Sequence, residues 1–111
     1  MSKFVSQANI DNYVGILNSD ILLSPDKRAT ITELLITELE KLNHDREQLE
    51  FAETRAAKGR ERLKLVRHLR DNAAPAIREN AERLVANVEA VQRLLENSCR
   101  RLLAKVKSYA P

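Results

Sequence analysis

Apolar residues recur every seven positions through the middle of the chain. A repeat of this kind over about five heptads is typical of helices that pack as a left-handed coiled coil. Polar Glu38 and Asp45 interrupt one of the two heptad positions. Between residues 24 and 72 one position carries Leu35, Leu42, Leu49, Ala56 and Leu63, and its companion carries Ile31, Ala52, Gly59 and Val66.

Start and stop signals define the bounds of this helix. Ser24-Pro25-Asp26 offers an N-cap oxygen, a proline at the first helical position and an acid in the first turn, all of which favour a helix start. The next comparable stop is the stretch 71–75, so we expect one helix over 24–72 that forms a rod of about 70 Å at 1.5 Å per residue. Glycine inside a helix costs about 1 kcal/mol, and the alternative is a kink or break at Gly59.

Two further helices follow from the same spacing. Apolar residues at three- and four-residue intervals predict a short amphipathic helix over 6–17, followed by Ile21-Leu22-Leu23 as an apolar step that pins it as a lid on one end of the rod. Pro75 begins a third helix over 75–109, in which Ser98 is the polar exception. The seam of this third helix comprises Ile77, Ala81, Leu84, Val88, Val91, Leu95, Leu102 and Tyr109.

The short connection at 71–74 predicts that the two long helices run antiparallel. Residues whose numbers sum to about 147 should then face each other, which places Leu63 near Leu84 and Ala56 near Val91. Leu42 should lie near Leu102 or Lys105. We expect the small residues at 52, 56 and 59 to mark the closest approach of the two helices.

The distribution of charge favours the same pairing. Residues 33–53 contain seven acids and two bases, whereas residues 55–70 contain seven bases and one acid, Glu61. The folded-back helix sets Arg100, Arg101, Lys105 and Lys107 beside the acidic half. Exposed pairs contribute well under about 1 kcal/mol each, so charge here selects orientation.

The expected fold is therefore all-α, a single helical domain over residues 1–111 built from a short helix and a long hairpin. A two-helix rod has nowhere to bury the apolar residues outside its seam, and exposed apolar surface of this kind marks an interface. We expect a homodimer that completes a bundle, in which each acidic half meets a basic half. The predicted partner-binding stripe comprises Leu34, Phe51, Leu65, Leu69, Leu94 and Leu103, with Val85 beside it.

Composition narrows the function to interaction with other molecules rather than catalysis. The chain has 111 residues, 32% of them charged and 4% aromatic, with a net charge of +3. Cys99 has no second cysteine with which to form a disulfide, and His44 and His68 form no metal-ligand cluster with it. Because no catalytic or cofactor motif occurs, we expect a non-enzymatic, cytoplasmic interaction or scaffold protein without a cofactor. No apolar run is long enough to span a membrane.

A nucleic-acid-binding function is the alternative. One face of the basic segment 55–70 carries three positively charged side chains, those of Arg60, Lys64 and Arg67. Their spacing allows them to bind a row of phosphate groups. Neither an aromatic residue for base stacking nor a Gly-rich element accompanies them. A solvated helix face is therefore favoured over an anion-binding one.

Part of the chain resembles a known group of proteins. Asn9-Ile10-Asp11-Asn12-Tyr13 with Ile16-Leu17, followed by Leu34-Leu35, Glu38 and Lys41-Leu42, is similar to the N-I-x-x-Y-x-x-L-L and L-L-x-x-E-x-x-K-L pattern of short uncharacterised helical proteins of α-proteobacteria. This resemblance implies a small cytoplasmic bacterial protein. The stretch from Asn80 to Tyr109 also resembles helical flagellar export chaperones, which implies a chaperone function as a further alternative.

Overall fold

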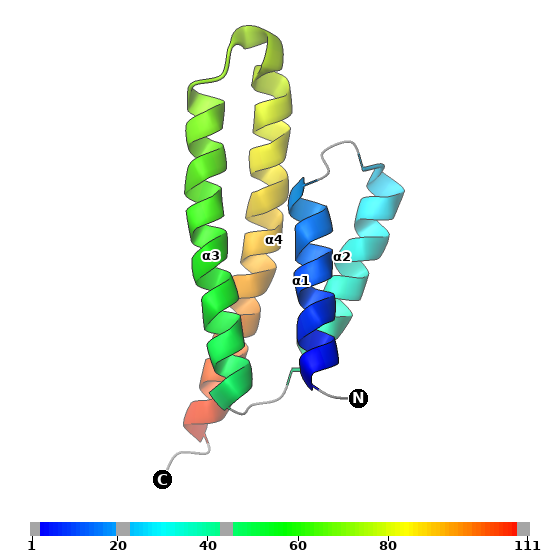
Figure 1. Cartoon of the computed structure of the whole chain (residues 1–111), viewed down its shortest axis with the longest axis vertical. Helices are drawn as coiled ribbons and strands as arrows, with labels where there is room; N and C mark the ends of the chain where they lie inside the picture. Colours follow the sequence, from blue (N-terminus) through cyan, green and yellow to red (C-terminus); the bar gives the residue numbers. More distant parts are fainter. Residues whose placement is uncertain (1–2, 20–22, 43–45, 109–111) are drawn as a thin grey trace.

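The described residues of the chain fold into four helices. A computed structural model describes residues 3–19, 23–42 and 46–108. Figure 1 shows the helices with the longest axis of the molecule vertical. They are α1 (Lys3–Ser19), α2 (Pro25–Glu40), α3 (Arg46–Asp71) and α4 (Pro75–Ser108). The all-α class predicted from the sequence is confirmed, with no strand in the described part of the chain.

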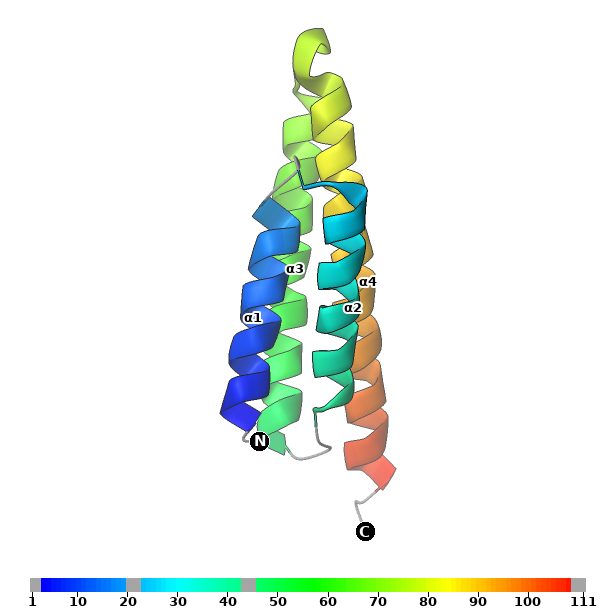
Figure 2. The same cartoon turned by 90° about the vertical axis from the view of Figure 1, so that its right-hand side faces the viewer.

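The four helices run alternately up and down and form two layers. Figure 2 shows the α1–α2 hairpin lying in front of the α3–α4 hairpin. The α3–α4 pair makes the most extensive contact, and α4 also packs against both α1 and α2. Since α3 and α4 continue past the ends of α1 and α2 (Figure 1), the upper part of the molecule is a two-helix projection.

The single helix predicted over 24–72 is wrong, because the segment divides into α2 and α3. Helix α2 ends at Glu40, and Lys41 at its C-cap donates its backbone N–H to carbonyl groups of the last turn. Helix α3 begins at Arg46. The molecule measures 56 × 26 × 17 Å, shorter than the predicted rod. The break does not fall at Gly59, which lies within continuous helix.

Burial explains why the chain bends there. With α2 folded back, Leu35, Leu39 and Leu42 become buried in one core together with Leu49 of α3 and Leu95 of α4. In an unbroken rod these side chains on α2 would reach only one neighbour. Burying a leucine fully is worth about 1.5–3 kcal/mol, which outweighs the few backbone hydrogen bonds lost at the break.

Helix α1 runs along the bundle instead of covering one end, so the predicted lid is also wrong. Its buried Ile10 and Leu17 belong to the main core, and the helix is longer at both ends than predicted. The predicted N-cap of α2 is confirmed, because Ser24 Oγ accepts the backbone N–H of Lys27 at 3.3 Å. Leu23 packs against the core, whereas Ile21 and Leu22 lie outside the described residues.

The antiparallel pairing of the two long helices is confirmed, and the described contacts agree with the predicted register. Val66, Val85 and Val88 form a small upper core against which Leu63 and Leu84 both pack. Lower down, Gln92 Nε2 donates to the carbonyl of Ala56 at 2.9 Å. Leu42 lines the same depression as Leu102 and Lys105. Tyr109, the last predicted seam residue, lies outside the described part of the chain.

Candidate functional site

The predicted apolar stripe separates into parts when it is placed on the structure. Phe51 and Leu94 are half-buried and pack against the main core, and Val85 is buried in the upper core. Leu34 is exposed on α2, and Leu103 is exposed in the last turns of α4. Leu103 lies 28 residues from the first residue of α4, or about 40 Å along the helix, so it cannot share one surface with residues at the other end of the hairpin.

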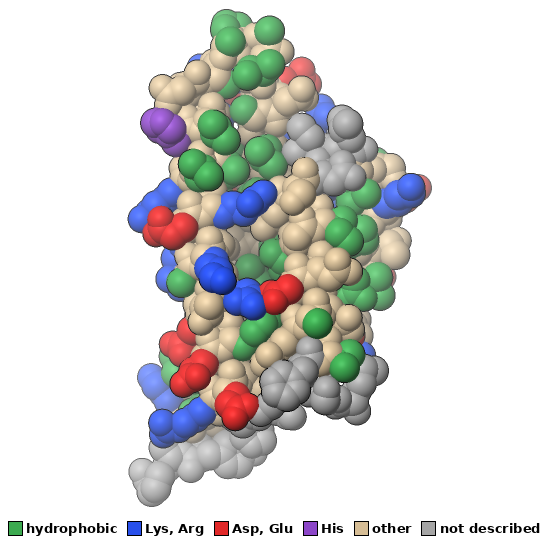
Figure 3. Space-filling model, viewed as in Figure 1, with side chains coloured by type: hydrophobic (Ala, Val, Ile, Leu, Met, Phe, Trp, Pro, Cys, Tyr) green, Lys and Arg blue, Asp and Glu red, His purple; other side chains and the backbone are tan. Residues whose placement is uncertain are grey.

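The remaining two members of the stripe, Leu65 and Leu69, lie at the hairpin tip. We use this name for the projecting end of α3 and α4 that carries Leu65, Leu69 and Ile77. Their side chains are 59%, 53% and 56% exposed, and Figure 3 shows hydrophobic side chains gathered over this end. Ile77 was predicted to be buried in the seam, and that prediction is wrong because neither α1 nor α2 reaches the first turn of α4 (Figure 1).

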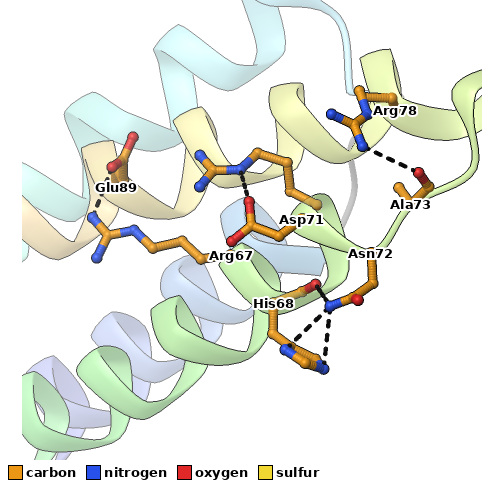
Figure 4. A network of polar contacts seen from close by, with 8 residues as sticks. Arg67, His68, Asp71, Asn72, Ala73, Arg78 and Glu89 are labelled. Atoms are coloured by element: carbon orange, nitrogen blue, oxygen red, sulfur yellow. Dashed lines mark hydrogen bonds and ion pairs between the residues drawn. The ribbon is translucent and has the colours of Figure 1, made fainter.

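Polar contacts hold the turn that ends the tip. Asn72 Nδ2 donates to the carbonyl of His68 at 2.8 Å, and its backbone N–H donates to the same oxygen. Arg78 reaches the carbonyl of Ala73 across the turn, as Figure 4 shows. The bonds to His68 satisfy a carbonyl group in the last turn of α3, and the bond from Arg78 satisfies a carbonyl group of the turn itself. The turn therefore fixes how the two helices present their apolar side chains.

The three predicted anion-binding residues share one face of α3, and each has a carboxylate partner. Arg60 pairs with Glu96 at 3.0 Å, and Arg67 pairs with Glu89 at 2.9 Å. Lys64 pairs with Glu61 on its own helix at 3.4 Å. The Arg67 guanidinium holds the pKa of Glu89 below its usual value. Charge on this face is locally balanced, and phosphate binding there stays a prediction.

A second set of cations lines a groove on another face of α3. Arg55, Lys58 and Arg62 project beside α1, and together with Asp11 and Asn18 they border a groove of about 370 Å³. Both glycines of the chain, Gly15 of α1 and Gly59 of α3, also line this α1–α3 groove, and Val14 and Leu95 supply its apolar surface. In Figure 3 basic side chains gather at mid-height on this face.

Two arginines bridge the α1–α3 groove. Arg55 forms a two-pronged ion pair with Asp11, and this hydrogen bonding raises the pKa of the Arg55 guanidinium. Arg62 donates to the backbone carbonyl of Asn18 at 3.0 Å, which satisfies an acceptor in the last turn of α1. Because the two arginines are seven residues apart, about 10 Å of α3 lies between the bridges. Lys58 occupies that interval.

The cysteine and histidines provide no reactive centre in the described residues. Burial raises the pKa of the half-buried Cys99 thiol, and the nearby carboxylates of Glu53 and Glu96 act in the same direction. His68 is exposed and contacts Asn72, whereas His44 lies outside the described residues. Within the part of the chain that is described, no three His, Cys, Asp or Glu residues come together as a metal site. No described helix is long and apolar enough to cross a bilayer.

Comparison with known proteins adds no relative. No protein-family model, curated protein or solved structure matches this chain.

The α1–α3 groove was missed by sequence reasoning, although one signal for it was present. Arg55, Lys58 and Arg62 follow i, i+3, i+7 spacing, which puts them on one helix face. That face is turned away from the face of Arg60, Lys64 and Arg67. The sequence did not show that α1 lies beside the face of Arg55, Lys58 and Arg62, because the position of α1 depends on the break between α2 and α3.

Proposed function

We propose that this chain is a non-enzymatic helical interaction protein that forms a homodimer through its hairpin tip. The observation that carries this proposal is the exposure of Leu65, Leu69 and Ile77 on two helices that project beyond the bundle. Exposed apolar side chains on a projecting element favour an interface. The other exposed large hydrophobic side chains among the described residues, Val5, Leu34 and Leu103, are less exposed and lie outside the hairpin tip, so we place the contact at the tip.

The charges at the hairpin tip favour a second copy as the occupant. Residues 58–70 of α3 contain six bases and one acid, whereas residues 75–89 of α4 contain three acids and two bases. In a two-fold symmetric dimer, α3 of each copy lies on α4 of the other. Such an interface is self-complementary. Because Arg67 and Glu89 already pair within one copy, the charges select the orientation of the two copies and add little to the affinity.

The size of the apolar contact sets the expected affinity. About half of each of the three side chains is still exposed, which leaves about 1 kcal/mol per side chain to be gained by burial. Six side chains in two copies then contribute about 6 kcal/mol, while association costs at least about 4 kcal/mol. The net gain is at most about 2 kcal/mol, so we expect a very weak dimer with a dissociation constant of tens of millimolar.

Light scattering over a concentration series up to about 5 mM, where a dimer with a dissociation constant of tens of millimolar becomes detectable, tests the proposal. The mass of the wild type should rise from 12.7 kDa towards twice that value. Leu69→Glu should stay monomeric, because it places a charge in the apolar contact. Leu34→Glu is the matched control, since Leu34 is exposed on α2 away from the hairpin tip. A constant mass of 12.7 kDa, or equal loss of the dimer in both variants, would contradict the proposal.

A further inference from the structure

The α1–α3 groove contains positive charge that nothing in its lining balances. Asp11 neutralises Arg55, but Arg62 donates to a backbone carbonyl, which has no formal charge. Lys58 has no ion-pair partner among the described residues and lines the groove between them. Two cations are thus left for an external anion, and their positions four residues apart put both heads on one side of α3.

A buried acceptor without a donor lies in the same place. Asn18 is 6% exposed and lines the groove, yet its side-chain Oδ1 has no hydrogen-bond donor among the described residues. Buried polar atoms are nearly always paired, so each exception calls for an explanation. The backbone oxygen of the same residue is already satisfied by Arg62. The side-chain oxygen is therefore the acceptor left for a bound molecule, once the Asn18 side chain turns it towards the groove.

The shape of the groove suits a small organic molecule. A Cβ atom on Gly15 would have no heavy atom of the surroundings within 4 Å, so the glycine leaves open space on the α1 wall. The volume of about 370 Å³ lies at the lower end of the range for small-molecule sites. Val14 and Leu95 offer apolar contact, which a bare inorganic ion would not use.

We propose that the α1–α3 groove binds a small organic oxyanion, a phosphate or a carboxylate, that also carries a hydroxyl or amino donor. Lys58 and Arg62 hold the anionic group by charge-assisted hydrogen bonds, and Asn18 Oδ1 accepts from the donor. The short carbon body lies against Val14 and Leu95. This site is on a different surface from the hairpin tip and does not depend on dimerisation.

Titration of the ¹⁵N-labelled full chain with three probes tests the site by amide chemical shifts. Glycerol 3-phosphate and glycerate carry the oxyanion and hydroxyl donors, and the one that binds identifies the oxyanion. Propyl phosphate keeps the anion but lacks the donor, so it should bind several-fold more weakly than glycerol 3-phosphate. Saturable shifts in residues 11–19 and 55–62 with millimolar affinity are expected. Failure of both donor-bearing probes to saturate by about 10 mM, or equal affinity for propyl phosphate and glycerol 3-phosphate, would overturn the proposal.

Two variants separate binding from folding. Lys58→Gln removes a charge that has no partner among the described residues and should weaken binding about tenfold without changing the fold. Gly15→Leu should abolish binding by filling the groove, while the open space at that position and the helix propensity of leucine preserve α1. Lys64→Gln is the control, because Lys64 pairs with Glu61 outside the groove. Equal effects of Lys58→Gln and Lys64→Gln would contradict the assignment.

Discussion

The side chain of Gln92 on α4 occupies the space that a side chain on Gly59 of α3 would need. A Cβ atom at residue 59 would lie 1.8 Å from Gln92 Oε1 and 2.8 Å from its Cδ. The amide nitrogen of Gln92 is fixed by its bond to the Ala56 carbonyl. Gly59 therefore keeps the two helices close enough for a buried side-chain bond to cross between them.

Gly59→Ala should destabilise the protein by about 1–2 kcal/mol. Alanine favours a helix by about 1 kcal/mol, but the added methyl displaces Gln92 from a tight position and breaks its buried bond. Urea unfolding measures the change. In a Gln92→Ala background the same substitution should become stabilising, and a cost that persists there would show that Gln92 is not the reason for the glycine.

Gly15→Ala should stabilise the protein by about 0.5–1 kcal/mol. No heavy atom of the surroundings lies within 4 Å of the added methyl group. The free energy of unfolding is therefore changed only by the helix propensity of alanine and by the reduced conformational freedom of the unfolded chain. Urea unfolding of Gly15→Ala and Gly59→Ala measures the same added methyl group at an open and at a filled position, so each variant serves as the control for the other. A loss of stability would mean that the α1–α3 groove is narrower than described.

Ala56→Leu should cost at least about 1–3 kcal/mol, because Ala56 is fully buried between α3 and α4 and extra methylene groups strain a filled core. Ala57→Leu, one residue along the helix and exposed, is the control and should be close to neutral. Thermal unfolding compares the two variants. Equal midpoints would contradict the register of the hairpin.

Removing the charge of Glu38 should lower stability in a pH-dependent way. Glu38 is buried on α2. Burial alone raises its pKa, but Lys41, whose Nζ donates to Glu38 Oε1 at 3.1 Å, and the nearby polar side chains of Ser6 and Asn9 on α1 hold the pKa below its usual value. A lowered folded pKa means that the stabilisation is present above the unfolded value and is lost as pH falls through the folded value. Glu38→Gln should thus be less stable than the wild type at pH 7 and equal to it near pH 2. A pH-independent difference in urea unfolding would exclude this linkage.

The sequence predicted α4 and its antiparallel packing against α3 well, because the proline at the start of α4, the short turn and the apolar spacing are all local signals. Pro75 begins α4 as expected, and Val88, Val91 and Leu95 form the predicted buried seam. The break between α2 and α3 was missed because Leu35, Leu42 and Leu49 keep a regular heptad spacing across it. Asn43 and Asp45 are residue types that are common at helix ends, but this indication of a break was weaker than the heptad repeat that favours a continuous helix.

The sequence also could not show which side chains become buried once the chain breaks between α2 and α3. Once α1 and α2 fold back, Phe51 and Leu94 find partners inside one copy, whereas Leu65 and Leu69 do not. A heptad pattern gives the direction of a side chain around its helix, but it does not tell how far a neighbouring helix extends. The hairpin tip and the α1–α3 groove both depend on where α1 ends.

Distances between spin labels in two copies test the hairpin-tip dimer most directly. On a Cys99→Ser background, one label is placed at Ala76 in the first turn of α4 and, in a second sample, at Lys107 in its last turn. These positions are about 45 Å apart along the helix. Dimerisation through the hairpin tip predicts a short distance between the two Ala76 labels and a much longer one between the two Lys107 labels. A shorter distance at Lys107 than at Ala76, or no coupling between copies at either position, would contradict the account.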